Sequence, residues 1–169
     1  MKIRRLTAGD IDALYRVYSD PEGCRWVGDG SPITMDQCER WVAVTQNNYD
    51  QRGYGMFAVE LIENNPSVDQ SIDRVVGFCG LVHPGGQEVA ELKYALDRSL
   101  WGQGLGAELA GAMLSYALDG VGCDRVIATI APQNTASIRI VERIGMNRTE
   151  PRQEDDGSMT EVYEITSSD

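Results

Sequence analysis

A glycine-rich turn between an expected strand and an expected helix constrains this chain more than any other stretch. The segment Leu100–Glu108 reads LWGQGLGAE. The preceding residues Val89–Leu96 alternate like a strand, whereas Leu105, Leu109 and Met113 recur at helical spacing. Glycine permits positive φ and close approach of a ligand to the backbone. The first turn of a helix presents N–H groups without intrahelical acceptors and the positive end of the helix dipole. The turn therefore predicts an anion site, most simply for phosphate.

The turn alone also fits a ligand-free connection, and two phosphate-binding motifs can be compared with it. It lacks Gly-Lys-Ser/Thr, which excludes a nucleoside triphosphate loop. The pattern Gly102-x-Gly104-x-x-Ala107 formally fits a dinucleotide fingerprint. That fingerprint requires a carboxylate about 20 residues further on, at the end of the next strand. The next expected strand, Arg125–Ile130, is followed by Ala-Pro-Gln, so a dinucleotide site is disfavoured.

The length and composition indicate one globular domain over residues 1–169. A chain of 169 residues can bury a sizeable core, and 42% apolar and 24% charged residues are ordinary for a soluble protein. No apolar run approaches the roughly 18 residues of a membrane span. The first residues, MKIRRL, lack the apolar core of a signal peptide, so the expected location is cytoplasmic.

The charge and the cysteines narrow the class of ligand. A net charge of −11 argues against nucleic-acid binding. It fits a cationic or amine-bearing substrate, and it fits a solvated acidic surface equally well. The 4 cysteines are widely spaced, and the only histidine is His83, so no metal site is expected. In a cytosolic protein such cysteines are expected to be small buried residues.

The hydrophobic periodicity predicts a mixed α/β fold. Capping boxes at Thr7 and Thr34, and an N-cap at Asn134, mark helix starts. The expected helices cover about 8–19, 35–49, 103–119 and 135–144. The expected strands cover about 2–6, 56–62, 75–83, 89–96, 125–130, 146–152 and 159–165. We therefore expect a mostly antiparallel sheet of about seven strands flanked by about four helices, with one parallel junction beside the glycine turn.

This order of elements, together with several spaced motifs, resembles the GNAT superfamily of acyl-CoA N-acetyltransferases over nearly the whole chain. The family's pyrophosphate loop, Arg/Gln-x-x-Gly-x-Gly/Ala, is matched at Gly104 and Gly106, whereas Trp101 departs from Arg/Gln. Trp-Gly-Gln-Gly followed by Ala-Glu resembles the subfamily of ribosomal-protein N-terminal (alanine) acetyltransferases. Three further stretches resemble that subfamily: Glu91–Tyr94, Asn134–Arg139 and Arg143–Met146.

The resemblance implies that acetyl-CoA is the donor and assigns residues to it. Backbone amides of the glycine loop would hold the CoA pyrophosphate. The end of the preceding strand would hydrogen-bond the pantetheine arm, and Asn134 would contact this arm from the other side, although a helix cap alone also explains Asn134. The loop residues are Gly102, Gln103, Gly104, Leu105, Gly106 and Ala107, and the strand residues are Tyr94, Ala95 and Leu96.

The chemistry of acetyl transfer calls for a base and an acid. An α-amino group with a pKa near 8 is only about one-tenth neutral at pH 7, and a lysine amine is far less so. A general base offsets that deficit. Glu91 is the first candidate, with an outward-facing or ion-paired strand residue as the alternative; His83 is the second, with plain surface as its alternative. Ser137 resembles a serine of the subfamily that protonates or binds the thiolate, and local capping also explains it. Val141 occupies the position where many family members carry a tyrosine that acts as the general acid.

The expected function is transfer of an acetyl group from acetyl-CoA to a primary amine, either a protein N-terminus or a small molecule. The alternative is a non-catalytic CoA-sensing or partner-binding module of the same fold, and an NAD-binding enzyme is a distant third. Arg25 and Trp26, on a loop between glycines, are expected either to line the acceptor pocket or to cover the core, and the polar segment 63–74 is expected to shape the same pocket. Neither a metal, a nucleic acid nor a membrane is expected as a partner, and the resemblance implies a homodimer.

Overall fold

The computed structural model describes residues 1–28, 30–62, 75–154 and 156–167. The expected loop 63–74 lies outside the described residues. Eight strands are hydrogen-bonded in the order β1-β2-β3-β4-β5-β8-β6, and β7 pairs with β8. The strands are β1 Lys2–Arg5, β2 Met56–Glu60, β3 Val75–Val82, β4 Ala90–Leu96, β5 Arg125–Ile130, β6 Asn147–Arg148, β7 Arg152–Gln153 and β8 Met159–Thr166.

The helices begin where the sequence places capping residues. Thr34 and Gln37 exchange the two hydrogen bonds of a capping box at 2.8 and 3.3 Å. The Asn134 side chain accepts from the backbone N–H of Ser137. The helices are α1 Ile11–Ser19, α2 Pro21–Cys24, α3 Met35–Arg52, α4 Leu105–Ser115 and α5 Thr135–Arg143, and a π-helical turn, Tyr116–Gly120, extends α4.

The chain divides into two compact units, and β3 and β4 each contribute residues to both. Unit 1 consists of Met1–Cys79 and Tyr94–Trp101, and unit 2 consists of Gly80–Lys93 and Gly102–Asp169. The prediction of one domain over 1–169 stays a prediction. The mixed, mostly antiparallel fold is confirmed, because β4 and β5 form a parallel pair and the neighbouring pairs β1–β2 and β5–β8 are antiparallel.

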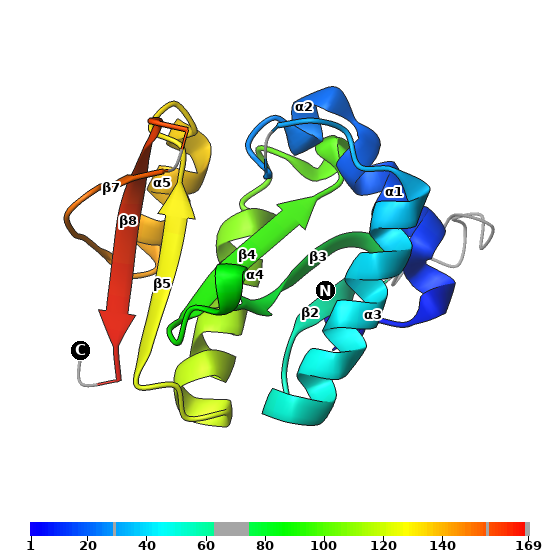
Figure 1. The fold of residues 1–169 in the computed structure, drawn as a ribbon, viewed down its shortest axis with the longest axis horizontal. Coiled ribbons are helices and arrows are strands. Elements are labelled where there is room, and N and C mark those ends of the chain that lie inside the picture. The colour runs from blue at the N-terminus through cyan, green and yellow to red at the C-terminus, as the bar shows by residue number, and fades with distance from the viewer. Residues whose placement is uncertain (29, 63–74, 155, 168–169) are drawn as a thin grey trace. The chain divides into compact units, whose positions relative to one another are not determined.

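Aromatic residues form the core of unit 1. Tyr18 of α1 packs against Trp41 of α3, with ring centroids 4.8 Å apart, and against Phe78 of β3 at 6.0 Å. Tyr49 of α3 packs on Phe57 of β2 at 5.6 Å. These contacts fix α1 and α3 against β2 and β3, and Figure 1 shows both helices beside these strands.

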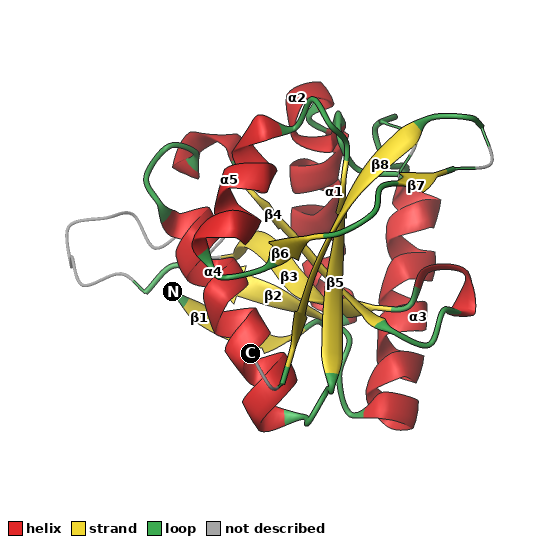
Figure 2. Ribbon diagram, turned by 90° about the vertical axis from the view of Figure 1, so that its left-hand side faces the viewer, coloured by secondary structure: helices red, strands yellow, loops and turns green. Residues whose placement is uncertain are grey.

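Unit 2 is built around the antiparallel pair β5–β8, which Figure 1 draws as two neighbouring arrows of opposite direction. Helices α4 and α5 pack on each other, as Figure 2 shows. Their close approach depends on Gly106, since a Cβ there would lie 3.0 Å from Cδ1 of Ile140. The side chains facing inward from α4 and β5 include Leu109, Met113 and Val126, all of them buried.

One short helix was not predicted, and one predicted strand was wrong. Helix α1 ends at Ser19, as predicted, and the Asp20 side chain then accepts from the Glu22 N–H and starts the short helix α2, with Pro21 at its first position. The expected strand 146–152 is two short strands, β6 and β7, separated by residues 149–151. Pro151 lies in this break, where its missing N–H removes a ladder donor.

An ion pair inside unit 1 predicts a measurable pH dependence. Asp10 is buried and accepts from the Arg4 guanidinium at 2.6 and 2.8 Å and from the Thr7 N–H at 2.8 Å. Burial raises the pKa of Asp10, but the bonds from Arg4 and Thr7 outweigh it and hold the pKa below its ordinary value. We expect Asp10→Asn to lower the free energy of unfolding by about 2 kcal/mol at pH 7 in urea titrations.

The lowered pKa of Asp10 also predicts how the stability difference between the variant and wild type changes with pH. A lowered pKa contributes stability above the unfolded-state value of about 3.9, and this contribution is lost as the pH falls through the folded-state pKa. The difference between wild type and Asp10→Asn should therefore shrink below about pH 4. The exposed Asp12 on the next turn is the control, and Asp12→Asn should change stability by less than about 0.5 kcal/mol. An Asp10→Asn difference that is constant down to about pH 2 would contradict the assignment.

Candidate functional site

The parallel junction of β4 and β5 places three polar side chains on one face of the sheet. The paired residues are Ala90 with Val126 and Glu91 with Ile127. Because side chains alternate along a strand, Lys93 lies on the same face as Glu91. On β5, Thr129 lies two residues beyond Ile127 and therefore faces the same side.

Glu91 lies at the centre of this group, and only 1% of it is exposed. Its Oε1 accepts from the Thr129 hydroxyl and contacts the Lys93 ammonium. Its Oε2 accepts from the side-chain amide of Gln87 at 3.3 Å. The Lys93 ammonium also donates to the Thr129 hydroxyl at 3.1 Å. We call Gln87, Glu91, Lys93 and Thr129 the Glu91 cluster.

His83 is linked to this cluster through Gln87. The His83 Nδ1 lies 2.9 Å from the backbone oxygen of Gln87. The Gln87 side chain in turn donates to the Val89 carbonyl at 2.9 Å as well as to Glu91. The structure therefore connects the two predicted bases, Glu91 and His83, through one intervening residue. The predicted alternative of plain surface for His83 is too simple, because its ring is half-buried.

The Glu91 carboxyl group is both paired and hydrogen-bonded within the cluster. A carboxylate removed from water is costly unless it is paired and hydrogen-bonded. Here one cation and two neutral donors surround it, while 40% of the Lys93 side chain remains exposed. The alternative of an outward-facing Glu91 is wrong, since the neighbouring strand buries it, and the alternative of an ion pair is confirmed. Such a carboxylate is a fixed, charged acceptor that can take up a proton.

The glycine loop has the backbone geometry that its sequence predicts. Gly102 and Gly104 adopt φ values of 74° and 79°, a region that other residues avoid. Gly104 is the N-cap of α4 and is exposed. The N–H of Ala107 donates to the Gly104 carbonyl at 3.2 Å, so this amide takes part in the helix's own bonding. The amides of Leu105 and Gly106 belong to the first turn, where a helix offers no carbonyl acceptors.

The first turn of α5 contains the other two predicted residues of unit 2. The Asn134 side chain accepts from the Ser137 N–H at 3.2 Å, which confirms its role as a helix cap. Ser137 is half-buried in that turn. A role of either residue toward a ligand stays a prediction.

In unit 1, Tyr94, Ala95 and Leu96 form the last three residues of β4. The Leu96 carbonyl accepts from the indole N–H of Trp101 at 2.8 Å. The residue that departs from the family's Arg/Gln therefore ties the strand end to the turn that follows it. Much of the Trp101 ring stays exposed.

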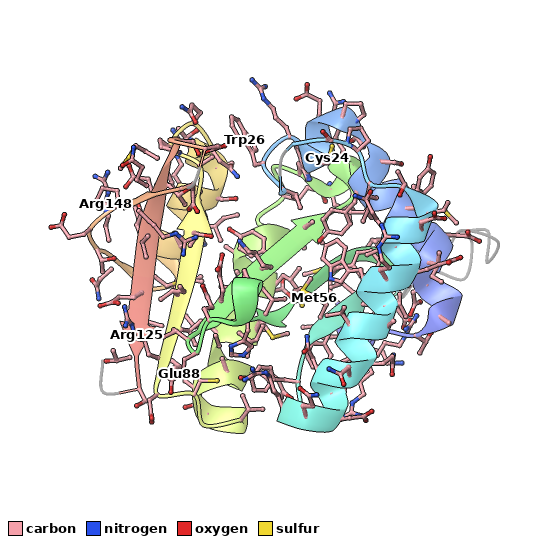
Figure 3. All side chains as sticks on the ribbon, viewed as in Figure 1. Cys24, Trp26, Met56, Glu88, Arg125 and Arg148 are labelled. Carbon is pink, nitrogen blue, oxygen red and sulfur yellow. The ribbon has the colours of Figure 1, made fainter. Side chains whose placement is uncertain are left out.

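Arg25 and Trp26, also in unit 1, follow α2 directly. The Arg25 guanidinium lies over the Trp26 ring, 4.8 Å from its centroid. Both side chains are exposed, and Figure 3 shows Trp26 projecting from the ribbon. Their role, in lining a pocket or in covering the core, stays a prediction. An exposed cation stacked on an aromatic ring is able to contact a ligand.

Three of the cysteines lie in the interior of the protein. Cys24, Cys38 and Cys79 are buried free thiols. Burial raises the pKa of Cys79 to about 12, which makes it an unreactive core residue. Among the described residues, no group of His, Cys, Asp and Glu could hold a metal ion. No helix in that part of the chain is long and apolar enough to cross a bilayer.

Sequence reasoning missed three members of the Glu91 cluster: Gln87, Lys93 and Thr129. Strand alternation was a sufficient signal for Lys93, which lies two residues after Glu91 on an expected strand. Thr129 required knowledge of the parallel register between β4 and β5. Gln87 lies in the turn before β4, where no periodicity gives its direction.

Known proteins resemble the chain in sequence and in fold. The family model described as acetyltransferase (GNAT) domain matches residues 1–147. A curated relative, described as an uncharacterized N-acetyltransferase p20 from Bacillus licheniformis, is 22% identical over 151 residues, which span 88% of this chain and 79% of that protein.

Three solved structures share the fold at low identity. The ribosomal-protein-alanine N-acetyltransferase from Brucella melitensis is 19% identical with a TM-score of 0.73, covering 98% of this chain and 99% of that chain. The spermidine N-acetyltransferase from Vibrio cholerae, in complex with CoA and spermine, is 15% identical with a TM-score of 0.76 over 99% and 95%. The protein yncA from Salmonella typhimurium, with its cofactor acetyl-CoA, is 20% identical with a TM-score of 0.73 over 100% and 95%. Because the family model matches most of its length, the chain belongs to the GNAT acetyltransferase family.

Proposed function

We propose that the protein transfers an acetyl group from acetyl-CoA to a primary amine, with Glu91 as the general base. The observation that carries this proposal is the Glu91 carboxylate, which is buried and paired on the strand that leads toward the glycine loop. Family membership supplies the reaction class. The solved relative that contains acetyl-CoA supports the donor.

The donor contacts follow from the backbone geometry of the loop. Amides from Gly102 to Gly106 bind the CoA pyrophosphate, with Leu105 and Gly106 contributing first-turn N–H groups. Ala107 belongs to the same loop, but its N–H already donates to the Gly104 carbonyl. Gln103 and Gly104 bring the backbone to the phosphates. Tyr94, Ala95 and Leu96 bind the pantetheine arm through backbone groups, and Asn134 contacts the same arm.

Acetyl transfer to the acceptor requires deprotonation of the amine and protonation of the thiolate. The acceptor ammonium loses one proton to Glu91, directly or through water, and becomes a neutral amine. Its nitrogen attacks the thioester carbon, a C–N bond forms, and the C–S bond breaks. The departing thiolate takes a proton, for which the Ser137 hydroxyl is the proposed donor, and the extra proton of the amide nitrogen returns to the Ser137 oxygen. The net products are an N-acetylated amine, free CoA and one proton, and His83 is the second candidate for taking up that proton.

The acceptor is a protein N-terminus or a small amine. The net charge of −11 attracts such cationic acceptors. The structures of a ribosomal-protein-alanine N-acetyltransferase and of a spermidine N-acetyltransferase on the same fold support both classes. We assign Arg25 and Trp26 to acceptor binding, because both are exposed and stacked on one loop. The resemblance to the subfamily also leads us to propose a homodimer.

Calorimetric titration with acetyl-CoA tests the donor half of this proposal. We expect a dissociation constant of roughly 1–100 μM for acetyl-CoA and no binding of NAD. Gly104→Ala should weaken binding about tenfold, because a side chain at this φ displaces the first turn of α4. Gly157→Ala is the matched control: Gly157 also has positive φ, and a Cβ at either position would meet nothing within 4 Å.

Two outcomes separate the alternatives. No binding of acetyl-CoA by the folded protein would mean that the glycine loop is only a turn. Binding without thiol release across a panel of N-terminal peptides, polyamines and small monoamines would favour a CoA-sensing module. Val141, in place of the tyrosine acid, is the observation that keeps this second function under test.

A further inference from the structure

We propose that Lys93 is a positioning residue that keeps Glu91 ionised and fixes its reactive oxygen, with Thr129 as the link between the two. This inference rests on the proposed function, since it concerns the base of that reaction. Its evidence is the pattern of contacts in the Glu91 cluster: the Lys93 ammonium touches both the Glu91 carboxylate and the Thr129 hydroxyl.

The three groups form a closed ring of contacts around one oxygen. The Thr129 hydroxyl donates to Oε1 of Glu91 and accepts from Lys93 at 3.1 Å. A hydroxyl has one proton to donate, so its acceptance from Lys93 directs that proton toward Glu91. Gln87 binds the other oxygen, Oε2, at 3.3 Å. Oε1 is therefore fixed by two partners from β4 and β5, and rotation of the carboxylate would break contacts on both sides.

Among the described residues, the Lys93 ammonium is the cation that forms a salt bridge with the Glu91 carboxylate. The partners from the other elements, Thr129 on β5 and Gln87 in the preceding turn, are neutral. The His83 Nδ1 lies 2.9 Å from the backbone oxygen of Gln87. With 1% of Glu91 exposed, water cannot replace the ammonium as a counter-charge. Loss of the Lys93 charge therefore favours the protonated carboxyl, which cannot act as a base.

Lys93 also gives the buried carboxylate a partner that reaches solvent, because 40% of its side chain is exposed. A cation at this position therefore stands beside the proposed base and in contact with water.

The test compares Lys93→Met, Lys93→Gln and Lys93→Arg with wild type in two readouts. The first is the pH dependence of kcat/KM with a monoamine acceptor. The second is ¹³C NMR of protein with labelled glutamate side chains, in which the Glu91 carboxyl signal is assigned by its loss in Glu91→Gln. We expect the acid limb of the rate profile and the NMR titration midpoint of Glu91 to move up together by at least about one pH unit in Lys93→Met. Lys93→Arg should restore both.

Lys93→Gln keeps an N–H donor without the charge and serves where Lys93→Met does not fold. It should give the same upward shift with a smaller change in stability. Thr129→Val should lower kcat more than it changes KM for acetyl-CoA, and Thr129→Ser should restore kcat. Arg125→Met is the matched control, because it removes another exposed cation that forms a salt bridge. Arg125 is the first residue of β5, is labelled in Figure 3, and pairs with Glu164. It should move neither readout.

The two proposals fail in distinguishable ways. An NMR midpoint that stays within about 0.2 pH units of wild type in both Lys93→Met and Lys93→Gln would overturn the role of Lys93, whether or not the protein turns over. If acetyl-CoA neither binds nor reacts while the midpoint still shifts, the proposed function fails and the coupling of Lys93 to Glu91 stands.

Discussion

Glu91→Gln should lower kcat/KM for acetyl transfer by about 100- to 1,000-fold at pH 7 while leaving the affinity for acetyl-CoA within about twofold of wild type. A positioned general base contributes a factor of this size when the acceptor arrives mostly protonated. Glutamine has the shape of glutamate, and its oxygen can still accept from Thr129 and Lys93. The fold should therefore persist, and the loss should fall on the proton transfer.

The pH profile distinguishes loss of a base from loss of structure. An acceptor with a pKa near 8 becomes neutral without help as the pH rises toward 9. The deficit of Glu91→Gln should thus shrink with pH and be smallest above about pH 9. A structural defect would lower the rate by a similar factor at every pH. Steady-state assays of thiol release between about pH 6 and pH 9.5, at saturating acetyl-CoA, make this comparison.

Glu88→Gln is the matched control for this variant. Glu88 lies three residues earlier in the chain, is exposed, and is labelled in Figure 3. Its replacement removes the same charge from the same region without touching the Glu91 cluster. We expect a rate within about 1.5-fold of wild type. If Glu91→Gln behaves like Glu88→Gln over the whole pH range, Glu91 is an ion-pair partner and the base lies elsewhere, with His83 as the first residue to test.

Much of the fold could be predicted because its signals are local. The capping boxes at Thr7 and Thr34 specify helix starts through bonds within four residues, and both form. The period-two pattern of Val89–Leu96 identifies β4 without any knowledge of its neighbours. The short helix α2 was missed because one residue serves two helices: Asp20 follows the last residue of α1, and its side chain also caps the start of α2.

The candidate site divides in the same way between local and non-local information. The positive φ of Gly102 and Gly104 is a property of single residues, so the sequence predicts the loop. The burial of Glu91 is not local, because β5 and the turn at Gln87 cover it only once the sheet has formed. The contact of Thr129 with Glu91 depends on the register Glu91–Ile127, which nothing in either strand specifies alone.

The role of Trp101, which departs from the family pattern, becomes clear only from the structure. The resemblance marks it only as a mismatch for Arg/Gln. Its indole N–H, however, binds the Leu96 carbonyl at 2.8 Å, five residues back along the chain. This bond occupies one acceptor of the strand end proposed for pantetheine. The amides and carbonyls of Tyr94 and Ala95 therefore carry more of that proposed interaction than the sequence alone suggests.

Gly77→Ala should be the most destabilising small substitution in unit 1, lowering the free energy of unfolding by about 3 kcal/mol. A Cβ at position 77 would lie 2.5 Å from the Ala95 carbonyl oxygen, 2.7 Å from Cδ2 of Leu96 and 3.2 Å from its Cα. Two of these atoms are backbone, so no rotamer change relieves the overlap, and β3 must move away from the end of β4. The backbone bond from Asp97 N–H to the Val76 carbonyl, 2.7 Å long, would be lost or stretched in that movement.

Gly111→Ala is a control for which we expect the opposite change in the free energy of unfolding. Gly111 lies inside α4, and a Cβ there would meet Cγ2 of Ile144 at 3.6 Å, an ordinary contact. Alanine is favoured over glycine inside a helix, so we expect stabilisation by about 0.5–1 kcal/mol. Urea unfolding of both variants, beside wild type, measures the contrast directly. A Gly77→Ala protein as stable as wild type would show that the ends of β3 and β4 are not held at this distance.

Gly77→Ala also distinguishes an effect on acetyl-CoA binding from an effect on catalysis. Displacement of Ala95 and Leu96 moves the backbone groups that we assign to pantetheine, while the Glu91 cluster belongs to unit 2. We expect Gly77→Ala to weaken acetyl-CoA binding at least about tenfold in calorimetry at a temperature where the variant is folded. At saturating acetyl-CoA the remaining rate should keep the wild-type pH profile, because the base and its partners are unchanged. Undiminished affinity in a destabilised Gly77→Ala would place the pantetheine arm away from the end of β4.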